Sequence, residues 1–474
     1  MSLGGLARSS LNSLPGVNLR PPPGELPSAS VAENAAFNAL VVVPNGVQGL
    51  FRRRPAAVRA ATRADVDRWA VRLLRGMRRT YGGSPVWVRA LASPALLLLD
   101  VADVRRALEG SPDPFASDPE AKRRGMEHFQ PDALTISRGE AWANRRRFTE
   151  SVLATEEEAH PLSGHIAAVV GEEIDALVGE VEAGGGGLRW KPWSEALWRI
   201  TRRVVLGDSA RDDREVSDLL ARLMDEANSL PRSESESLAP FLARIERYVA
   251  APEEGALVAR FADAPADEGT HPARQVPHWL FAMGDTLAIN CFRALAAIAT
   301  HPRVLARVER ETAAAGEAGA GGEAAPLAGS HYLGACLHEA MRLWPTTPML
   351  SRETVRETRW DGAWVPKGSQ LLIVNAYMHR DPDRHEFANR FAPEAWLDGD
   401  AGEDWAFNHF SHGPQGCPGT RLALFVGGAA IAGLLGRRRI ELLAPRLDPD
   451  RPLPHMLDFF SIRAELGGGD RAAA

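Results

Sequence analysis

The sequence predicts a mostly helical protein with small β-sheets, long enough to bury a large core. Residues 277–300 form the clearest helical pattern, because apolar residues recur there at helical spacing and His301-Pro302 closes the segment. Further helical patterns follow one another between residues 139 and 249. Short runs rich in β-branched or alternating apolar residues indicate strands, at 86–88, 95–99 and 371–374.

In chain order, we expect an irregular lead-in over residues 1–35, one domain over 36–466 and a flexible tail over 467–474. The expected helices lie at about 63–79, 100–109, 139–154, 159–182, 192–206, 214–229, 238–249, 277–300, 331–343 and 420–435. In the first of these, Val66, Trp69, Leu73 and Met77 form the expected apolar stripe. Residues 115–138 resemble a long connection, and 184–187 and 313–329 resemble flexible loops.

Composition excludes several classes of protein. The formal net charge of −6 gives no support to bulk nucleic-acid binding. Three scattered cysteines are too few for a disulfide framework and favour a reducing, cytoplasmic setting. The N-terminus shows neither a signal-peptide pattern nor an apolar run long enough to span a bilayer, so we expect no membrane anchor.

One cysteine, Cys417, lies in a glycine-rich loop that opens onto an apolar helix. A cysteine thiolate can be an axial iron ligand if the backbone lets a flat macrocycle approach it closely. Gly413, Gly416 and Gly419 carry no Cβ, which allows tight turns and a close approach. The alternative is a surface turn that contains an incidental cysteine.

Glu339 and Arg342 lie three residues apart on the predicted helix 331–343, so their side chains share a face. Neighbouring apolar residues favour partial burial: Leu333, Leu337, Met341 and Trp344. We interpret the pair as a structural pin rather than a catalytic dyad. The alternative is an ion pair exposed to solvent.

Glu-x-x-Arg at 339–342, followed by Phe-x-x-Gly-x-x-x-Cys-x-Gly at 410–419, resembles the cytochrome P-450 (haem-thiolate monooxygenase) family, in its soluble bacterial form. The similarity extends from about Trp142 to the end of the last helix. It implies the family's triangular helical prism around a buried haem. It also implies haem b held by the thiolate of Cys417, with Glu339 and Arg342 bracing that side.

The same resemblance assigns further residues to the cofactor. Trp142-x-x-x-Arg146 resembles the helix that reaches a haem propionate, although an ordinary basic surface helix is the alternative. Arg352 resembles the strand arginine that pairs with a propionate. The cofactor loop contributes Phe410, Gly413, Gln415 and Gly419.

Three positions depart from the family pattern. Gln415 stands where the family has Arg or His, so haem anchoring is expected to rely more on Arg146 and Arg352. Ala395 replaces the arginine that completes the network of the Glu-x-x-Arg pair, and Arg390 is a candidate substitute. Met283 stands where the family prefers Gly.

Asp285 and Thr286 on the long helix resemble the family's acid–alcohol pair above the iron, where the helix is locally widened. Cleavage of O2 needs a proton source, and a hydroxyl that holds water beside a carboxylate supplies one. The alternative is an Asp-Thr pair that faces solvent. Candidate residues of the substrate pocket flank this helix and the strand that follows: Leu280, Phe281, Met283, Thr347, Met349 and Leu350.

The resemblance implies insertion of one oxygen atom from O2 into an apolar small molecule, for instance a natural-product intermediate. We find no flavin or iron–sulfur motif, so we expect separate ferredoxin and ferredoxin reductase partners. Arg145, Arg146 and Arg147, with Arg437, Arg438 and Arg439, are the candidate docking patch. The alternatives are a peroxide-driven or other O2-independent haem enzyme and, more remotely, a non-catalytic haem or small-molecule binding protein.

Overall fold

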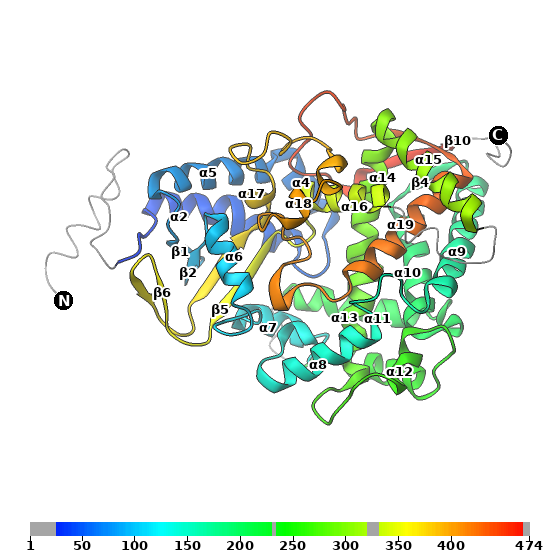
Figure 1. The fold of residues 1–474 in the computed structure, drawn as a ribbon, viewed down its shortest axis with the longest axis horizontal. Helices are drawn as coiled ribbons and strands as arrows, with labels where there is room; N and C mark the ends of the chain where they lie inside the picture. Colours follow the sequence, from blue (N-terminus) through cyan, green and yellow to red (C-terminus); the bar gives the residue numbers. More distant parts are fainter. Residues whose placement is uncertain (1–24, 230–233, 320–330, 468–474) are drawn as a thin grey trace, which may run out of the picture. The chain divides into compact units, whose positions relative to one another are not determined.

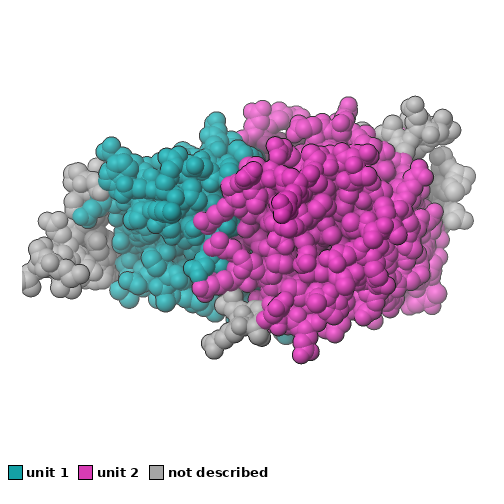
Figure 2. All heavy atoms as spheres, turned by 90° about the horizontal axis from the view of Figure 1, so that it is seen from below, with its two compact units in different colours: residues 1–120, 347–388, 404–416 teal, residues 121–346, 389–403, 417–474 magenta. Residues whose placement is uncertain are grey.

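The computed structural model describes residues 25–229, 234–319 and 331–467. The chain forms two compact units, coloured separately in Figure 2. Unit 1 comprises residues 1–120, 347–388 and 404–416, and unit 2 comprises 121–346, 389–403 and 417–474. Each unit is therefore assembled from segments that lie far apart in the sequence.

Unit 1 holds a five-stranded sheet in the order β1-β2-β8-β5-β3 and a hairpin, β6-β7 (Figure 1). Its strands are β1 (Val86–Ala90), β2 (Ser93–Leu97), β3 (Phe115–Ala116), β5 (Met349–Thr354), β6 (Thr358–Trp360), β7 (Ala363–Val365) and β8 (Gln370–Val374). Its helices are α2 (Val31–Phe37), η1 (Asn38–Val42), α3 (Val43–Gln48), α4 (Pro55–Ala64), α5 (Val66–Tyr81), α6 (Val101–Glu109), α17 (Asn375–His379) and the 3-10 turn η8 (Gly413–Gln415).

Most pairs in this sheet are antiparallel, but β2 and β8 run parallel, with Leu96 opposite Leu371. Both of those leucines are fully buried, because the continuous apolar runs of the two strands face the core on both sides. The strands share one hydrophobic cluster with α5 and α6. The sheet therefore fixes where β5, which carries Arg352, lies within unit 1.

Unit 2 is almost entirely helical. Its helices are α7 (Glu120–Glu127), η2 (Leu134–Ile136), α8 (Gly139–Val152), α9 (Ser163–Ala183), α10 (Trp190–Leu206), η3 (Asp208–Ala210), α11 (Arg214–Ala227), α12 (Leu238–Ala250), η4 (Leu257–Ala262), η5 (Pro272–Gln275), α13 (Val276–Phe281), η6 (Ala282–Leu287), α14 (Ala288–Thr300), α15 (Pro302–Gly319), α16 (His331–Leu343), η7 (Pro393–Trp396), α18 (Asp400–Glu403), α19 (Thr420–Arg437) and η9 (Phe459–Ser461). A three-stranded sheet, β4 (Gly187–Arg189), β10 (Arg463–Gly467) and β9 (Arg439–Ala444), completes it.

The core of unit 2 is the packing of α14 against α10, α16 and α19 (Figure 1). At Gly427 of α19, an added Cβ would lie 2.8 Å from Sγ of Cys291 and 3.2 Å from a methyl group of Leu287. Only a residue without a side chain allows this approach. The helix that follows Cys417 is thereby brought directly against the long helix from Pro272 to Thr300.

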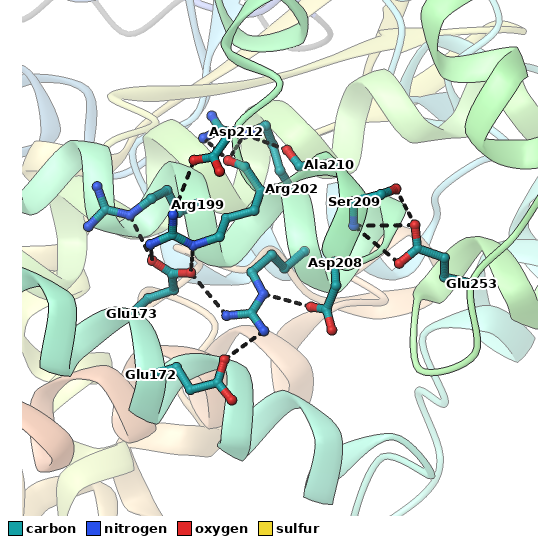
Figure 3. Close-up of polar contacts among 11 residues, drawn as sticks. Glu172, Glu173, Arg199, Arg202, Asp208, Ser209, Ala210, Asp212 and Glu253 are labelled. Carbon is teal, nitrogen blue, oxygen red and sulfur yellow. Dashed lines mark hydrogen bonds and ion pairs between the residues drawn. The ribbon is translucent and has the colours of Figure 1, made fainter.

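A charged network stabilises the outer part of unit 2 (Figure 3). Glu173 of α9 has only 1% of its side chain exposed and accepts hydrogen bonds from Arg199, Arg203 and Arg211. Its pKa reflects two opposing effects. Burial acts to raise it, but the three arginine hydrogen bonds together hold it below its usual value.

The predicted helices from 139 onward are present within a few residues of their expected bounds, and helix 331–343 matches α16. Other expectations were wrong. Residues 31–35 are helical, because Ser30 and Glu33 form a capping box that starts α2. The connection 115–138 contains β3, α7 and η2.

Two further expectations about helices also need correction. Part of the expected loop 313–329 belongs to α15, which extends to Gly319, and residues 320–330 lie outside the described residues. In α5 the buried stripe is Ala70, Val71, Leu74 and Met77, whereas Trp69 is 49% exposed. Most of the predicted lead-in and tail, residues 1–24 and 468–474, also lies outside the described residues.

Two helices among the described residues are apolar and long enough to cross a membrane by length and composition alone: Pro272–Thr300 and Thr420–Arg437. Their apolar windows are 72% and 61% buried inside the protein. Core helices of globular proteins pass the same test, and both helices pack within unit 2.

Candidate functional site

Cys417 lies at the start of unit 2's last segment, three residues before α19. Its side chain is accessible, yet desolvation by the surrounding protein raises the pKa of the thiol. A hydrogen bond from the Gly419 backbone, the Thr420 hydroxyl and the charge of Arg146 all act in the opposite direction and favour the thiolate. A positively charged metal ion at this sulfur would complete that stabilisation.

The three glycines of the loop differ in backbone conformation. Gly413 has a φ of +70°, and an added Cβ would collide with the carbonyl oxygen of Leu108. Gly416 and Gly419 have ordinary negative φ values of −61° and −94°. Within unit 1, the glycine at 413 is therefore required by the packing of the loop against the end of α6.

Arg352 in unit 1 is a buried cation that lacks a carboxylate partner among the described residues. Its guanidinium donates to Oγ of Ser111 at 2.8 Å, Oγ of Ser411 at 3.1 Å and the carbonyl of Ser351 at 3.0 Å. Burial lowers its pKa to about 10. Such a cation needs an anion, and a carboxylate ligand matches the planar guanidinium.

Gln415, also in unit 1, has both side-chain amide atoms buried without a hydrogen-bond partner in the described part of the chain. Buried polar atoms are nearly always satisfied in folded proteins, so this amide also indicates a missing ligand. Within unit 1, the charge of Arg352 and the amide of Gln415 fit the carboxylate side chains of a haem. Within unit 2, the donors around the Cys417 sulfur fit an iron ion.

Trp142 and Arg146 lie on α8 in unit 2, as the sequence predicts. Arg146 already pairs with Glu150, with 2.6 Å between Nε and Oε1. Trp142 is partly buried. The charge of Arg146 acts on Cys417, so α8 carries a cation within electrostatic range of the thiol. The propionate role of Trp142 and Arg146 stays a prediction.

Glu339 and Arg342 form a bidentate ion pair with no exposed side-chain surface. Arg342 donates to Glu339 at 2.7 Å and 2.6 Å. Glu339 also accepts from the backbone N–H of Ala392 and from the Trp396 indole, each at 2.9 Å. The pair is therefore buried, as predicted, and it ties α16 to the segment that contains η7.

The side chain of Arg390 does not replace the arginine that is missing at Ala395, so that prediction was wrong. The Arg390 side chain is exposed, and its backbone carbonyl accepts a hydrogen bond from Arg342 at 3.0 Å. Trp396 supplies the donor that Ala395 cannot supply. Sequence reasoning missed this role, although a tryptophan one residue after Ala395 was a visible signal because a buried indole N–H needs an acceptor.

Asp285 and Thr286 lie in η6, a π-helical turn in the long helix, and both are partly exposed. Such turns often occur at functional sites. Gly284 precedes the pair, and an added Cβ there would lie 2.5 Å from the ring of Trp198 of α10. Trp193, also on α10, donates its indole N–H to the carbonyl of Ala288 at 2.9 Å. Two tryptophans of α10 thus contact this turn, one in its middle and one just after its last residue.

The candidate pocket residues differ in their surroundings. Leu280 has no exposed surface and Met283 has 7%, so both pack into the core of unit 2 in this structure. Phe281 is partly exposed and packs edge-to-face on Phe129. In unit 1, Thr347 is exposed, whereas Met349 and Leu350 pack partly buried against the hydrophobic cluster.

The basic clusters are a poor docking patch. Arg145 is buried and pairs with Asp132 at 2.9 Å, so it cannot form part of a surface. Arg437 pairs with Asp175, and Arg438 pairs with Glu182. Intramolecular carboxylates therefore neutralise much of the charge on which the predicted patch depended.

Comparison with known proteins gives a match over the second half of the chain. The model of the family "Cytochrome P450" matches residues 270–456. Cytochrome P450 3A31 of Mesocricetus auratus is 31% identical over 148 residues, which cover 31% of this chain and 30% of that protein. Beta-amyrin 24-hydroxylase of Glycine max is 34% identical over 113 residues, 22% of each chain.

Cytochrome P450 4c3 of Drosophila melanogaster is 32% identical over 119 residues, 25% of this chain and 22% of that protein. The matches thus span only about a fifth to a third of the relatives' lengths, from 21% to 35% among the first four. Proteins of this family carry haem b with an axial cysteine thiolate. The matched region includes the buried Glu339–Arg342 pair and the Cys417 loop, so residues 270–456 of this chain are similar to the cytochrome P450 family.

Proposed function

We propose that this protein is a haem-thiolate monooxygenase that inserts one oxygen atom from O2 into an apolar small molecule. The observation that carries the proposal lies within unit 2. The helix that follows the accessible Cys417 packs, at Gly427, directly against the helix whose π turn bears Asp285 and Thr286. Two relatives are named as hydroxylases, one of beta-amyrin and one of lithocholate.

Cys417 would be the axial ligand. The bound haem iron supplies the activation of O2 in this chemistry. Gly419 and Thr420 stabilise negative charge on the sulfur, and Arg146 adds a long-range positive charge. In unit 1, Arg352, whose charge has no carboxylate partner among the described residues, and Gln415, whose amide is unpartnered there, would bind carboxylates of the cofactor. In unit 2, Trp142 and Arg146 are the proposed residues for the same role.

Asp285 and Thr286 would handle protons. The Thr286 hydroxyl can hold a water molecule by donating to it or accepting from it, and the Asp285 carboxylate can take a proton from solvent and pass it on. Both side chains are partly exposed, which this role requires. In Thr286→Ala, we expect consumption of reducing equivalents to continue while product formation falls and released hydrogen peroxide rises.

The electrons would come from separate partners, for which a ferredoxin and its reductase are our candidates. Intramolecular pairing of Arg437 and Arg438 means that a docking surface must include other residues. We further propose a soluble bacterial enzyme of the cytoplasm that acts on a natural-product intermediate. Composition supports this part, whereas the relatives compared above come from a mammal, a plant and an insect.

The cofactor is tested by the absorption spectrum of the reduced protein with carbon monoxide. We expect the Soret band at the unusually red position that a thiolate ligand gives, and we expect Cys417→Ser to lose it while still folding. Cys336→Ser is a matched control, because Cys336 is buried and its raised pKa keeps it a neutral thiol. An unchanged spectrum in the Cys417 variant would refute the proposal.

The oxidant is tested by turnover with ¹⁸O2. Ferredoxin, its reductase and NADPH are compared with hydrogen peroxide alone, over a panel of apolar small molecules. We expect ¹⁸O in the product only with the electron donors present. Product formed equally well with peroxide, without label from O2, would instead establish the peroxide-driven alternative.

A further inference from the structure

Two polar side chains of unit 2, Gln130 and His278, share a hydrogen bond near two phenylalanine rings, and each leaves one hydrogen-bonding group unmet among the described residues. Gln130 has no exposed surface, and its Oε1 lies 3.0 Å from Nδ1 of His278 on α13. Because an amide oxygen only accepts, Nδ1–H of His278 is the donor. The Nε2 atom of Gln130 is buried and has no hydrogen-bond partner among the residues that the structure describes.

A second buried glutamine of the same region shows what a satisfied amide looks like. Gln275 accepts from the backbone N–H of Leu134 at 3.0 Å. Its Nε2 donates to the carbonyls of Asp132 at 2.9 Å and Thr270 at 3.0 Å. Gln275 is therefore structural, whereas Gln130 keeps a donor whose burial costs free energy until something accepts from it.

The ring of His278 supplies a hydrogen-bond acceptor beside the unpartnered donor of Gln130. Burial, aided by the charge of Lys122, lowers the pKa of His278 to about 4, so the ring is neutral at neutral pH. Since Nδ1 of His278 carries the proton, Nε2 of the same ring keeps its lone pair and can accept a hydrogen bond. No partner for this Nε2 atom is found in the part of the chain that the structure describes. Exchanging the oxygen and nitrogen of the Gln130 amide would only reverse the roles, again leaving one donor and one acceptor.

The surroundings of this pair are aromatic and lead toward the π turn. Phe129 and Phe281 pack edge-to-face with ring centroids 5.8 Å apart, and the Phe281 ring lies 6.2 Å from that of His278. His278 precedes Asp285 by seven residues on one continuous helix. That spacing corresponds to about two helical turns, or about 10 Å along the axis.

We propose that Gln130 and His278 form a subsite that binds the hydroxyl group of an otherwise apolar substrate. A hydroxyl can accept from Gln130 and donate to His278 with one oxygen atom. An ether oxygen would use only the donor, and a carboxylate would meet a neutral imidazole. This inference rests on the proposed monooxygenase function, and it places the substrate's hydroxyl about two helical turns from Asp285.

The subsite is tested by equilibrium dialysis of the full-length haem-loaded protein with three probes of similar size: octan-1-ol, octyl methyl ether and 1-chlorooctane. We expect the alcohol to bind roughly tenfold more tightly than the chloride, which corresponds to the net gain from two additional satisfied hydrogen-bonding groups. The ether should fall between them. Equal binding of alcohol and chloride by the wild-type protein would overturn the proposal.

Three variants identify the residues responsible. Gln130→Leu should reduce the preference for the alcohol to about threefold while the chloride binds as before, since it removes one of the two proposed hydrogen bonds. His278→Phe should reduce it in the same way, and it serves as the test if the first variant does not fold. Gln275→Leu, the matched control, should keep the full preference. An undiminished preference in both Gln130→Leu and His278→Phe would also overturn the proposal.

Stability gives a readout that needs no ligand. Gln275→Leu should unfold at clearly lower denaturant concentration, because three backbone groups lose their partner. Gln130→Leu should change the midpoint much less. The carbon monoxide spectrum of the same samples reports the cofactor separately. A missing thiolate signature with an intact alcohol preference would refute the proposed function and leave the subsite standing, and the reverse result would refute only the subsite.

Discussion

Glu339 and Glu173 are two fully buried carboxylates of unit 2 that the protein stabilises in opposite ways. Glu339 meets one cation, Arg342, and two neutral donors, and neither partner of the ion pair is exposed. Glu173 meets three cations. Those arginines also pair with acidic residues at the surface: Glu172, Glu180, Asp208 and Asp212.

The two sites differ in how many arginines neutralise the buried carboxylate. At Glu339, loss of the single cation leaves a charge that water cannot reach, and neutral donors alone cannot replace it. At Glu173, the remaining arginines still neutralise the carboxylate after one of them is lost, and the outer acidic residues are exposed by 47% to 82%. We therefore expect loss of one arginine to lower the free energy of unfolding strongly at Glu339 and only slightly at Glu173.

The largest effect is expected for Arg342→Leu. It leaves Glu339 buried without a cation and should lower the free energy of unfolding by about 3–5 kcal/mol. Urea denaturation followed by circular dichroism measures this loss. Arg199→Leu is the matched change at Glu173 and should cost at most half as much, because Arg203 and Arg211 remain. Equal losses would contradict the argument from redundancy.

Glu173→Gln should cost less, about 2 kcal/mol at neutral pH, because three charge-assisted hydrogen bonds become weaker neutral ones. The loss should depend on pH. The folded-state pKa of Glu173 is lowered, so its contribution is present above the unfolded-state pKa and disappears as pH falls through the folded-state value. Denaturation curves of wild type and variant should therefore converge on acidification, and a constant gap would contradict the assignment.

Trp396→Phe should lower stability by about 1–2 kcal/mol, since it removes one donor to a buried carboxylate and keeps the ring. Trp364→Phe is the control, because Trp364 is 62% exposed. Thermal unfolding of both variants compares the two indoles. If the Trp396 variant matches the control, the indole N–H does not replace the missing arginine.

The smallest effect is expected for Asp212→Asn. The Asp212 side chain is 82% exposed, and its pair with Arg211 is open to solvent. Such pairs contribute below about 1 kcal/mol, and salt weakens them further. Denaturation in low and high salt should show a small difference that vanishes in high salt. A larger loss would mean that the outer acidic residues organise the Glu173 network.

Local patterns in the sequence predicted what depends on local spacing. The helix from 277 to 300 follows from its apolar periodicity, and burial of Glu339 and Arg342 follows from their apolar neighbours. The capping box at Ser30 was equally local and was overlooked. These features need no knowledge of distant segments.

Contacts between residues far apart in the chain could not be predicted from local patterns in the sequence. Gln130 and His278 are 148 residues apart in sequence, and nothing local relates a glutamine before α8 to a histidine on α13. The contact between Trp198 and Gly284 has the same character. Arg145 is a further case, since an arginine among arginines resembles a surface patch until Asp132 and Ser137 are seen around it.

Arg352 has a consequence for how the protein behaves before its cofactor arrives. Three neutral oxygens accept hydrogen bonds from this buried guanidinium, and no carboxylate among the described residues neutralises it. The chain without its cofactor therefore folds with an uncompensated positive charge on strand β5. Any carboxylate ligand that reaches it should slow amide hydrogen exchange along β5 and its partner β8. Maturation of the enzyme would then be visible as a local tightening of this sheet.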